Sequence, residues 1–235
     1  EEEEDELKSL EKELMLDAKN KGLIPAGISF HVGSQQTNIK RWEEALESCF
    51  EVYSFLKLQN IKLEFINIGG GIPVDYQDYN FNLELFSKEL SNKIKNIFNN
   101  DLPKIMIEPG RYLVAESGVI ESEVVLVSKK DYQDNRRWIY LDIGRFGGLA
   151  ETEAEAIKYK IIPVNKEQFK TGPVIIAGPS CDGADILYEK YNYELPLNIV
   201  SGDKVRIYST GAYTSVYSSD FNGLQRLKVY FININ

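Results

Sequence analysis

The first half of the chain alternates between short apolar runs followed by glycine and longer stretches in which apolar residues recur at helical intervals. The apolar runs predict strands, and the helical stretches begin after Thr37, a predicted N-cap, and near Phe86. Strands that alternate with helices predict βα units and a parallel sheet, either a barrel or a doubly wound sheet. The predicted strands are residues 24–32, 61–68 and 104–108.

Polar or glycine-rich residues follow each of these predicted strands. Ligand sites gather at the carboxyl ends of the strands in both kinds of parallel fold, so these residues predict one shared pocket. Three consecutive glycines suit either a phosphate or a tight βα turn, and the Glu-Pro-Gly-Arg segment combines an exposed backbone with a permanent positive charge. The candidate residues are His31, Ser34, Gly69, Gly70, Gly71, Glu108, Gly110 and Arg111.

His31 is the only histidine in the chain. A single histidine excludes a His-rich metal site and leaves one base at most for a serine or cysteine nucleophile. Ser34 has no nucleophile-elbow pattern around it, so acyl transfer is not expected. The position of His31 at a strand end, beside Gly33 and Ser34, favours a role in the pocket over simple packing.

The pattern changes after about Gly118, where strand-like runs follow one another without a long helical period. This change predicts an α/β domain over residues 1–118 and a mostly antiparallel β domain over residues 119–235. The predicted strands of the second domain are residues 119–127, 138–143, 174–177, 204–208 and 227–232.

A loop over residues 178–185 carries a thiol and two carboxylates after one of these strands. Its glycines and proline predict that Cys181 is exposed, whereas a structural cysteine is usually buried. Catalysis and a simple turn explain this loop equally well. Tyr213 and Phe221 lie in glycine-containing loops rather than in strands, which indicates a pocket.

Charge and composition narrow the classes of partner. The net charge of −9 leaves no basic stripe, so no nucleic-acid partner is expected. No apolar run approaches a membrane span, no signal peptide is recognisable, and Cys49 and Cys181 make no disulfide framework, so the cytoplasm is expected. The chain opens inside an apparent helix, with acidic residues 1–4 at its start. An apolar side of this helix is predicted from Leu7, Leu10, Leu14 and Leu16.

Together, and in this order, these motifs resemble the pyridoxal-phosphate-dependent decarboxylases of ornithine, lysine, arginine and diaminopimelate. The resemblance runs from about Gly27 to Ile232. It implies an α/β plus β fold, in which residues 1–118 form part of a pyridoxal-phosphate-binding (β/α)₈ TIM barrel and residues 119–235 form the C-terminal β domain. It also implies a homodimer with its sites shared across the interface, and a small basic amino acid as substrate.

The resemblance implies how pyridoxal 5′-phosphate is held. His31 stacks on the cofactor ring, and Glu108 pairs with the pyridine nitrogen. A carboxylate there keeps the nitrogen protonated, so the ring can accept the electrons left when carbon dioxide departs. The phosphate is held by Ser34, Gly69, Gly70, Gly71, Gly110, Arg111 and Tyr213.

The resemblance also implies how the substrate is recognised. Cys181 arrives from the partner subunit and helps to protonate the carbanionic carbon. Asp182 holds the distal ammonium, Glu151 is the candidate for a second acidic group there, and Phe221 lines the pocket. An aspartate after the cysteine is typical of the ornithine type, whereas diaminopimelate decarboxylases usually have glutamate at that position.

The sequence departs from the family pattern in one respect. Members carry the lysine that binds the cofactor in an early barrel strand, in a Tyr-Ala-x-Lys type of motif, and this sequence has no counterpart. A fragment and a degenerate relative both explain this absence. The chain by itself is expected to be inactive, and half a barrel would leave open sheet edges.

The main hypothesis is decarboxylation of L-ornithine or L-lysine to putrescine or cadaverine, a step of polyamine biosynthesis. A diaminopimelate or carboxynorspermidine decarboxylase would share the cofactor and differ in the substrate tail. A non-catalytic regulatory homologue would have no need of Glu108 or Cys181. A cofactor-carrying protein without decarboxylase activity is usually a lone barrel, and the predicted β domain argues against it.

Overall fold

The computed structural model of the protein describes residues 2–99, 101–166 and 170–232, and the chain divides into two compact units. The first unit consists of Glu1–Pro73 and Phe81–Gly110, and the second of Val74–Asn80 and Arg111–Asn235. The predicted division between residues 118 and 119 stays a prediction. The structure adds a feature that the sequence pattern did not indicate, because a short piece of the first half belongs to the second unit.

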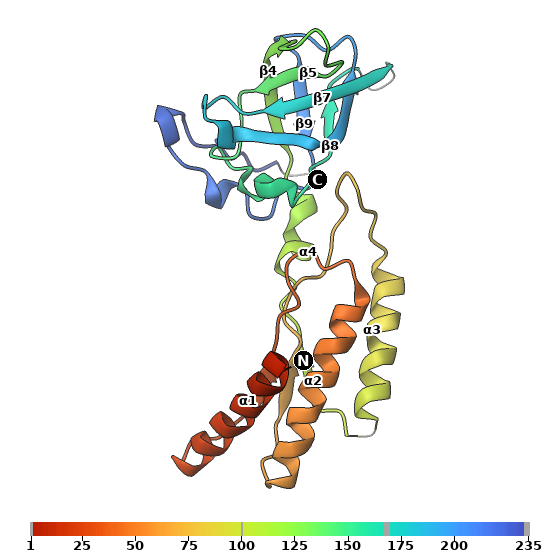
Figure 1. Ribbon diagram of the computed structural model, residues 1–235, viewed down its shortest axis with the longest axis vertical. Helices are drawn as coiled ribbons and strands as arrows, with labels where there is room; N and C mark the ends of the chain where they lie inside the picture. The colour runs from red at the N-terminus through yellow and green to blue at the C-terminus, as the bar shows by residue number, and fades with distance from the viewer. Residues whose placement is uncertain (1, 100, 167–169, 233–235) are drawn as a thin grey trace. The chain divides into compact units, whose positions relative to one another are not determined.

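The first unit is built on a parallel sheet with the strand order β1-β2-β3. The predicted alternation of strands and helices is confirmed here, but each strand has only three residues. The strands are β1 (Gly27–Ser29), β2 (Phe65–Asn67) and β3 (Lys104–Met106), and the helices are α1 (Glu2–Asn20), α2 (Ile39–Leu58) and α3 (Leu83–Phe98) (Figure 1).

Helices α2 and α3 pack against each other through aromatic and aliphatic side chains. Phe98 of α3 is buried, and its ring meets the rings of Phe50 and Tyr53 of α2 edge-on, at centroid distances of 5.1 and 5.7 Å. Helix α2 begins after Asn38, whose side chain accepts a hydrogen bond from the Lys40 amide at 3.1 Å. The predicted N-cap, Thr37, is therefore wrong by one residue.

Two lysine side chains of α1 contact α2. Lys8 forms an ion pair with Glu51 at 3.1 Å, and the Lys12 ammonium lies 5.4 Å from the centre of the Phe55 ring. Of the apolar side predicted for this helix, Leu10 and Leu14 are 51% and 58% exposed, and Leu16 is half-buried. The side chain of Leu7 lies outside the described residues. Glu1 lies outside the described residues. No helix in the described part of the chain is long and apolar enough to cross a membrane.

The second unit contains a six-stranded sheet with the order β6-β9-β4-β5-β7-β8. Only β5 and β7 are paired in parallel among these neighbours, so the predicted mostly antiparallel sheet is present in the described residues. Six short helices lie outside the sheet strands in the described residues. The strands are β4 (Ile120–Ser128), β5 (Arg137–Leu141), β6 (Ile161–Pro163), β7 (Thr171–Ala177), β8 (Ile186–Pro196) and β9 (Lys204–Ile207). The short helices are α4 (Gly110–Val114), which starts at the last residue of the first unit, and η1 (Ala115–Ser117), η2 (Ala150–Glu155), η3 (Gly183–Asp185), η4 (Ser215–Tyr217) and η5 (Phe221–Gly223).

Two strands of this sheet were not predicted, and one predicted strand is absent. Strands β6 and β8 form despite their many polar and tyrosine residues, because their buried side chains face the core. Residues 227–232 were predicted as a strand, but they pair with no strand in the described part of the chain. Tyr230 and Phe231 are 78% and 94% exposed there. An apolar run becomes a strand only where a neighbouring backbone can satisfy its amides and carbonyls.

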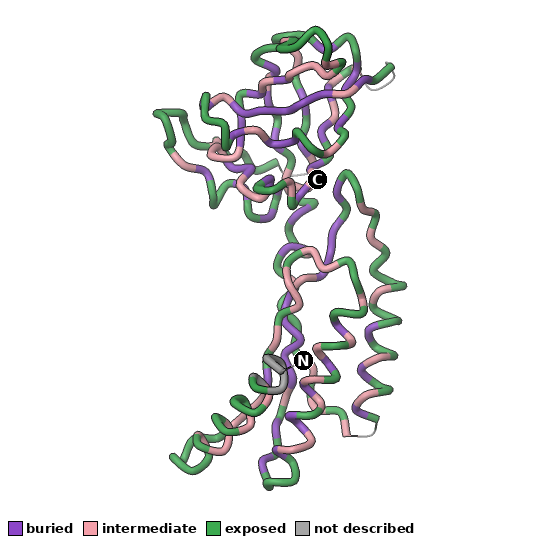
Figure 2. The backbone as a smooth tube through the Cα atoms, viewed as in Figure 1, coloured by how far each residue is buried: buried purple, intermediate pink, exposed green. Residues whose placement is uncertain are grey.

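Two buried tyrosines of β8 stabilise the chain that leads into β6. The Tyr188 hydroxyl accepts a hydrogen bond from the Tyr159 amide at 2.8 Å and donates one to the Ile157 carbonyl at 3.0 Å. The Tyr193 hydroxyl does the same for the Ile161 amide and the Tyr159 carbonyl, both at 2.8 Å. These hydroxyl groups satisfy backbone groups of residues 157–161, where Ile157, Tyr159 and Ile161 are buried. Figure 2 colours the buried residues along the chain purple.

Candidate functional site

The first unit brings together three polar side chains at the ends of its strands. The Gly70 amide donates a hydrogen bond to Nδ1 of His31 at 3.2 Å. Nδ1 is therefore an acceptor, and a neutral His31 ring carries its proton on Nε2. The ring is exposed, and this bond fixes its orientation at the end of β1.

Asn67, at the end of β2, connects the glycine-rich turn to Glu108. Its Nδ2 donates to Oε1 of Glu108 at 2.6 Å, and its Oδ1 accepts a hydrogen bond from the Gly69 amide at 3.0 Å. Glu108 was predicted as the last residue of the third strand. The strand ends at Met106 instead, and Glu108 is exposed in the turn that follows it.

The three glycines allow neighbouring backbones to approach closely. A Cβ atom at Gly69 would lie 2.2 Å from the Phe30 carbonyl oxygen, and one at Gly70 would lie 2.6 Å from that of Glu108. The Gly69 and Gly70 amides already donate hydrogen bonds within the chain, whereas the Gly71 amide has no partner among the described residues. Close packing thus accounts for the glycines, and one amide remains for an anion.

Two other candidate residues of the first unit, Ser34 and Gly110, lie in the segments that follow β1 and β3. Ser34 is exposed in the turn after β1, and the Gly110 amide donates to the Glu108 carbonyl at 2.9 Å. This last bond holds the turn after β3 in which Glu108 lies.

The second unit contains a buried arginine, Arg111, in the short helix α4. The Arg111 guanidinium is bound on one edge by the Glu151 carboxylate, with Nη1 to Oε2 at 2.8 Å, and it donates to the Tyr76 hydroxyl at 2.9 Å. The face of the Tyr213 ring lies 4.9 Å from the Arg111 Cζ atom. The structure therefore brings Arg111, Glu151 and Tyr213 together.

Burial alone would lower the pKa of Arg111, but the hydrogen bonds and negative charge of Glu151, together with Tyr76, raise it above its usual value. For Tyr76, burial has the opposite sign: it raises the pKa of the hydroxyl, and the nearby charge of Arg111 lowers it by less. The arginine therefore keeps its charge, and the Tyr76 hydroxyl stays neutral and available as an acceptor. Glu151, predicted as a substrate ligand, is engaged by Arg111, and its role toward a substrate stays a prediction.

The loop over residues 178–185 exposes its cysteine, as the sequence predicts. Cys181 has a left-handed backbone with a φ of 58°, an unusual conformation for a residue with a side chain. The other cysteine differs, since burial and then the charge of Glu11 raise the pKa of Cys49 to about 12. Between these two thiols, Cys181 is the one that a reagent or a substrate can reach.

Two predicted substrate residues make contacts within the second unit. The Asp182 carboxylate accepts a hydrogen bond from the Ala184 amide at 2.8 Å and caps η3, and the residue itself is exposed. The Phe221 ring stacks on Phe146 at a centroid distance of 4.2 Å.

Sequence reasoning missed three residues that hold these groups in place. Asn67 is a polar residue within an apolar run and lies two positions before the glycines, which was a usable signal. Asp185 was noted only as one of two carboxylates in its loop. Tyr76 gave no signal, because it lies in a short segment of the first half that belongs to the second unit.

Comparisons with known proteins identify the class of this arrangement. Residues 6–115 match the family model described as pyridoxal-dependent decarboxylase, pyridoxal binding domain. The chain is 32% identical over 222 residues to diaminopimelate decarboxylase of Staphylococcus aureus (strain COL), covering 91% of this chain and 50% of that protein. It is 31% identical over 212 residues to lysine/ornithine decarboxylase of Selenomonas ruminantium, covering 90% of this chain and 51% of that protein.

A solved structure supports the same assignment. The crystal structure of lysine/ornithine decarboxylase from Vibrio vulnificus, complexed with putrescine, aligns with a TM-score of 0.78 and 28% identity. The alignment covers 93% of this chain and 58% of that one. These comparisons show that the chain is similar to the group IV family of pyridoxal-phosphate-dependent decarboxylases, and residues 6–115 match the pyridoxal-binding domain of such enzymes. It spans about half the length of the curated relatives it matches.

The cofactor prediction, pyridoxal 5′-phosphate, is confirmed by the pyridoxal-binding domain that residues 6–115 match. The residues present suit this group chemically. Glu108 offers a carboxylate for the ring nitrogen, His31 offers an exposed ring, and the amide of Gly71 is open to an anion. Arg111, in the second unit, keeps a permanent positive charge, because Glu151 and Tyr76 hold its pKa above the usual value.

Proposed function

We propose that the protein takes part in pyridoxal-phosphate-dependent decarboxylation of a basic amino acid, with L-ornithine or L-lysine as substrate and putrescine or cadaverine as product. The observation that carries this proposal is the exposed Cys181 thiol in its left-handed turn, followed directly by Asp182. A thiol and a carboxylate side by side suit a reaction that must protonate a carbon while binding a distal ammonium. Such a reaction would belong to polyamine synthesis.

The fold of the whole protein is part of the proposal. The parallel strands β1 to β3 with their helices are the kind of unit from which a (β/α)₈ barrel is built, and the second unit is then the C-terminal β domain. Residues at the carboxyl ends of barrel strands form the active site. His31, Asn67 and Glu108 lie at or just after such strand ends.

The first unit then orients the cofactor. Pyridoxal phosphate, when bound, supplies the ring that accepts the electron pair released with carbon dioxide. Glu108 holds a proton at the ring nitrogen, and Asn67 fixes the Glu108 carboxylate through its bond of 2.6 Å. His31 would stack against the ring in the orientation set by Gly70, and Ser34, Gly71 and Gly110 would help to hold the phosphate.

The second unit supplies charge and the proton donor. Arg111 and Tyr213 would hold the phosphate, for which Arg111 would have to give up hydrogen bonds that it now makes to Glu151. Asp182 and Phe221 contact the substrate tail, and Glu151 faces the distal amine once it is released from Arg111. Cys181 delivers a proton to the carbon that loses its carboxylate, acting in the site of the partner subunit of a homodimer.

Decarboxylation by the protein from the complete reading frame tests the proposal directly. The protein would receive pyridoxal phosphate and, in parallel, ornithine, lysine, arginine and diaminopimelate. Carbon dioxide release from ornithine or lysine is expected. Release from diaminopimelate alone would establish the second candidate, which the similarity to a diaminopimelate decarboxylase favours. No release from any substrate would move the assignment to a non-catalytic homologue.

Replacement of the proton donor gives a sharper result. Cys181→Ala should lower turnover by about a hundredfold or more, the usual contribution of a positioned acid, and leave cofactor affinity unchanged. Product analysis should show more faulty protonation. Unchanged kinetics would remove Cys181 from the mechanism.

Mixing two defective variants, at a substrate concentration where each has low activity, tests the shared site. Arg111→Ala should weaken cofactor affinity more than substrate affinity, and Asp182→Ala should chiefly raise the substrate KM. Each variant is defective in a different half of a shared site, so hybrid dimers should contain one intact site. Recovery of part of the activity on mixing is expected, and no recovery would place both residues in one subunit's site.

A further inference from the structure

Asp185 is a buried charged residue to which the proposed reaction gives no role. Only 2% of its surface is exposed. Two glycines enclose the carboxylate, since a Cβ atom at Gly144 would lie 2.1 Å from Oδ1 and one at Gly178 would lie 2.4 Å from Oδ2. The two glycines thus form a niche in which the carboxylate fits and no additional side chain does.

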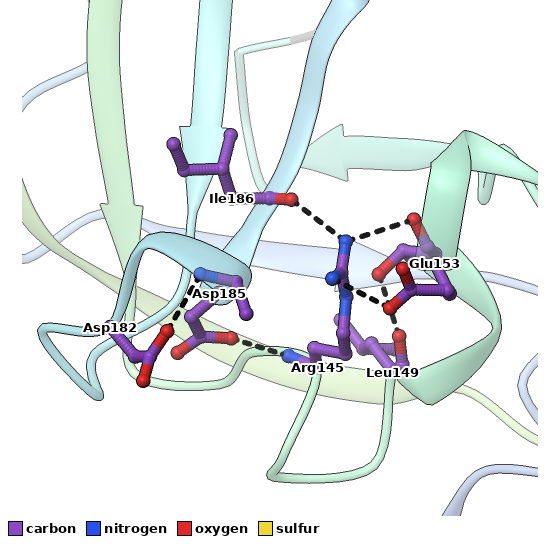
Figure 3. Close-up of polar contacts among 8 residues, drawn as sticks. Arg145, Leu149, Glu153, Asp182, Asp185 and Ile186 are labelled. Atoms are coloured by element: carbon purple, nitrogen blue, oxygen red, sulfur yellow. Dashed lines mark hydrogen bonds and ion pairs between the residues drawn. The ribbon is translucent and has the colours of Figure 1, made fainter.

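Inside this niche the carboxylate binds the backbones of two different loops. Oδ1 accepts a hydrogen bond from the Arg145 amide at 2.6 Å, and Oδ2 accepts one from the Ser180 amide at 3.0 Å (Figure 3 shows the bond to Arg145). Ser180 immediately precedes Cys181, and Arg145 lies in the loop between β5 and η2. One side chain therefore joins the loop of the thiol to the loop that leads to Glu151.

The backbone of Asp185 closes the thiol loop at both ends. Its amide donates to the Asp182 carbonyl at 3.0 Å, and its carbonyl accepts from the Gly178 amide at 2.8 Å. Two backbone hydrogen bonds of Asp185 and the bond from the Ser180 amide to its carboxylate thus hold residues 178–185. Cys181 lies within this loop and has a left-handed backbone.

The Arg145 side chain extends the same connection into η2. One terminal nitrogen donates to the Ile186 carbonyl at 3.1 Å and to the Thr152 carbonyl at 3.3 Å, and the other forms an ion pair with Glu153 at 2.8 Å (Figure 3). Thr152 directly follows Glu151 in η2. The Arg145 side chain and the Asp185 carboxylate therefore connect both functional segments of the second unit.

We propose that Asp185 is a positioning residue that fixes the Cys181–Asp182 loop relative to the Glu151-bearing turn, so that the thiol is held where it delivers its proton. This inference rests on the proposed function. It differs from a purely structural role, because it requires that the effect of Asp185 on turnover pass through Cys181.

Asp185→Asn is the most informative variant because it keeps the shape of the side chain. An amide offers one acceptor oxygen, and its NH2 group faces the second backbone amide, so one of the two bonds is lost. In the complete enzyme, kcat should fall between about tenfold and a hundredfold, as for a small displacement of a reacting group, with little change in substrate KM. Hydrogen exchange of the peptide that contains Ser180 should become faster in the same variant.

A double-mutant cycle with Cys181→Ala separates positioning from general destabilisation. If Asp185 acts through the thiol, then Asp185→Asn should lower kcat no further once Cys181 is alanine. An additive loss in the double variant would overturn the proposal. Asp203→Asn is the matched control, because this carboxylate also accepts a backbone hydrogen bond, from Val200 at 2.7 Å, in a different turn of the same unit.

Glycine variants test the niche without removing the carboxylate. Gly178→Ala should reproduce the loss of kcat, since its Cβ atom would displace the Asp185 oxygens. Gly183→Ala lies in the same loop, where a Cβ atom meets nothing within 4 Å, and it should behave like the wild type. Equal effects of the two alanines would contradict the proposal.

The hydrogen-exchange measurement needs no activity and therefore separates the two possible failures. If the wild-type protein decarboxylates none of the four substrates, the proposed function and the role of Asp185 in turnover are both overturned. Faster hydrogen exchange in Asp185→Asn would then still show that this carboxylate anchors the loop. If the wild type is active and exchange at Ser180 does not change, the positioning proposal alone is overturned.

Discussion

The two units of the chain hold their candidate site residues in different ways. In the first unit, His31 and Glu108 are exposed, and each is oriented by a neutral donor, the Gly70 amide or the Asn67 side chain. In the second unit, Arg111 and Asp185 are buried at 5% and 2% exposure, and both make several charged or charge-assisted hydrogen bonds.

This difference teaches where function and stability are coupled. An exposed side chain with one hydrogen bond can be replaced at little cost in stability, whereas a buried charge that loses its partner leaves a desolvated group behind. The first unit should therefore tolerate substitution of its site residues, and the second should lose stability together with function.

The largest expected effect is that of Arg111→Ala. The variant removes the guanidinium from Glu151, Tyr76 and Tyr213, and should lower the free energy of unfolding by about 3 kcal/mol, near the lower limit for a broken buried ion pair. Denaturant unfolding measures this loss. The control Arg226→Ala, whose ion pair with Asp220 is exposed, should unfold like the wild type. Equal losses in both variants would break the comparison.

A smaller effect is expected of Tyr188→Phe. Its hydroxyl satisfies the Tyr159 amide and the Ile157 carbonyl, both buried, and their loss should cost about 1–3 kcal/mol. Tyr230→Phe is the control, because that residue is 78% exposed. A stable Tyr188→Phe protein would mean that water replaces the hydroxyl group.

The buried tyrosines of β8, Tyr188 and Tyr193, predict how the stability of the second unit depends on pH. Burial raises the pKa of Tyr188 and of Tyr193, so both stay protonated in the folded state above pH 10, while a tyrosine of the unfolded chain ionises near about pH 10. The unfolded state then binds fewer protons, so stability is complete below about pH 10 and falls as the pH rises above it. Denaturant titrations on both sides of this value measure the slope, which should be shallower in Tyr188→Phe. A constant stability across this range would contradict the assignment.

The smallest effect on stability is expected of Glu108→Gln in the first unit. Glutamine keeps an oxygen for the Asn67 side chain, and the residue is exposed, so the free energy of unfolding should stay within about 0.5 kcal/mol of the wild type. Turnover should nevertheless fall, because the ring nitrogen loses its charged partner. A marked loss of stability would show that both units couple function to stability in the same way.

Sequence patterns predicted the elements that depend on local signals. The helical spacing of apolar residues located α2 and α3, and the glycines after β1 and β2 marked the turns of the first site. The exposure of Cys181 followed from the glycine and proline content of its loop. These features depend on residues that are close together in the sequence, so a local sequence pattern is sufficient to predict them.

Features that depend on distant partners were not predictable. Residues 227–232 have the composition of a strand but no partner strand in the described structure, whereas β8 forms because β7 pairs with it. Tyr76 contacts Arg111 across 35 positions of the chain, and the carboxylate of Asp185 meets the Arg145 amide across 40. A single sequence records no such distances.

The niche around Asp185 has a consequence for how this sequence can vary. The space that Gly144 and Gly178 leave open is the space that the carboxylate occupies, so a larger residue at either glycine requires a smaller residue at position 185. A smaller residue at 185 in turn leaves the amides of Arg145 and Ser180 without an acceptor. A substitution at position 144, 178 or 185 is therefore expected to depend on the residues present at the other two.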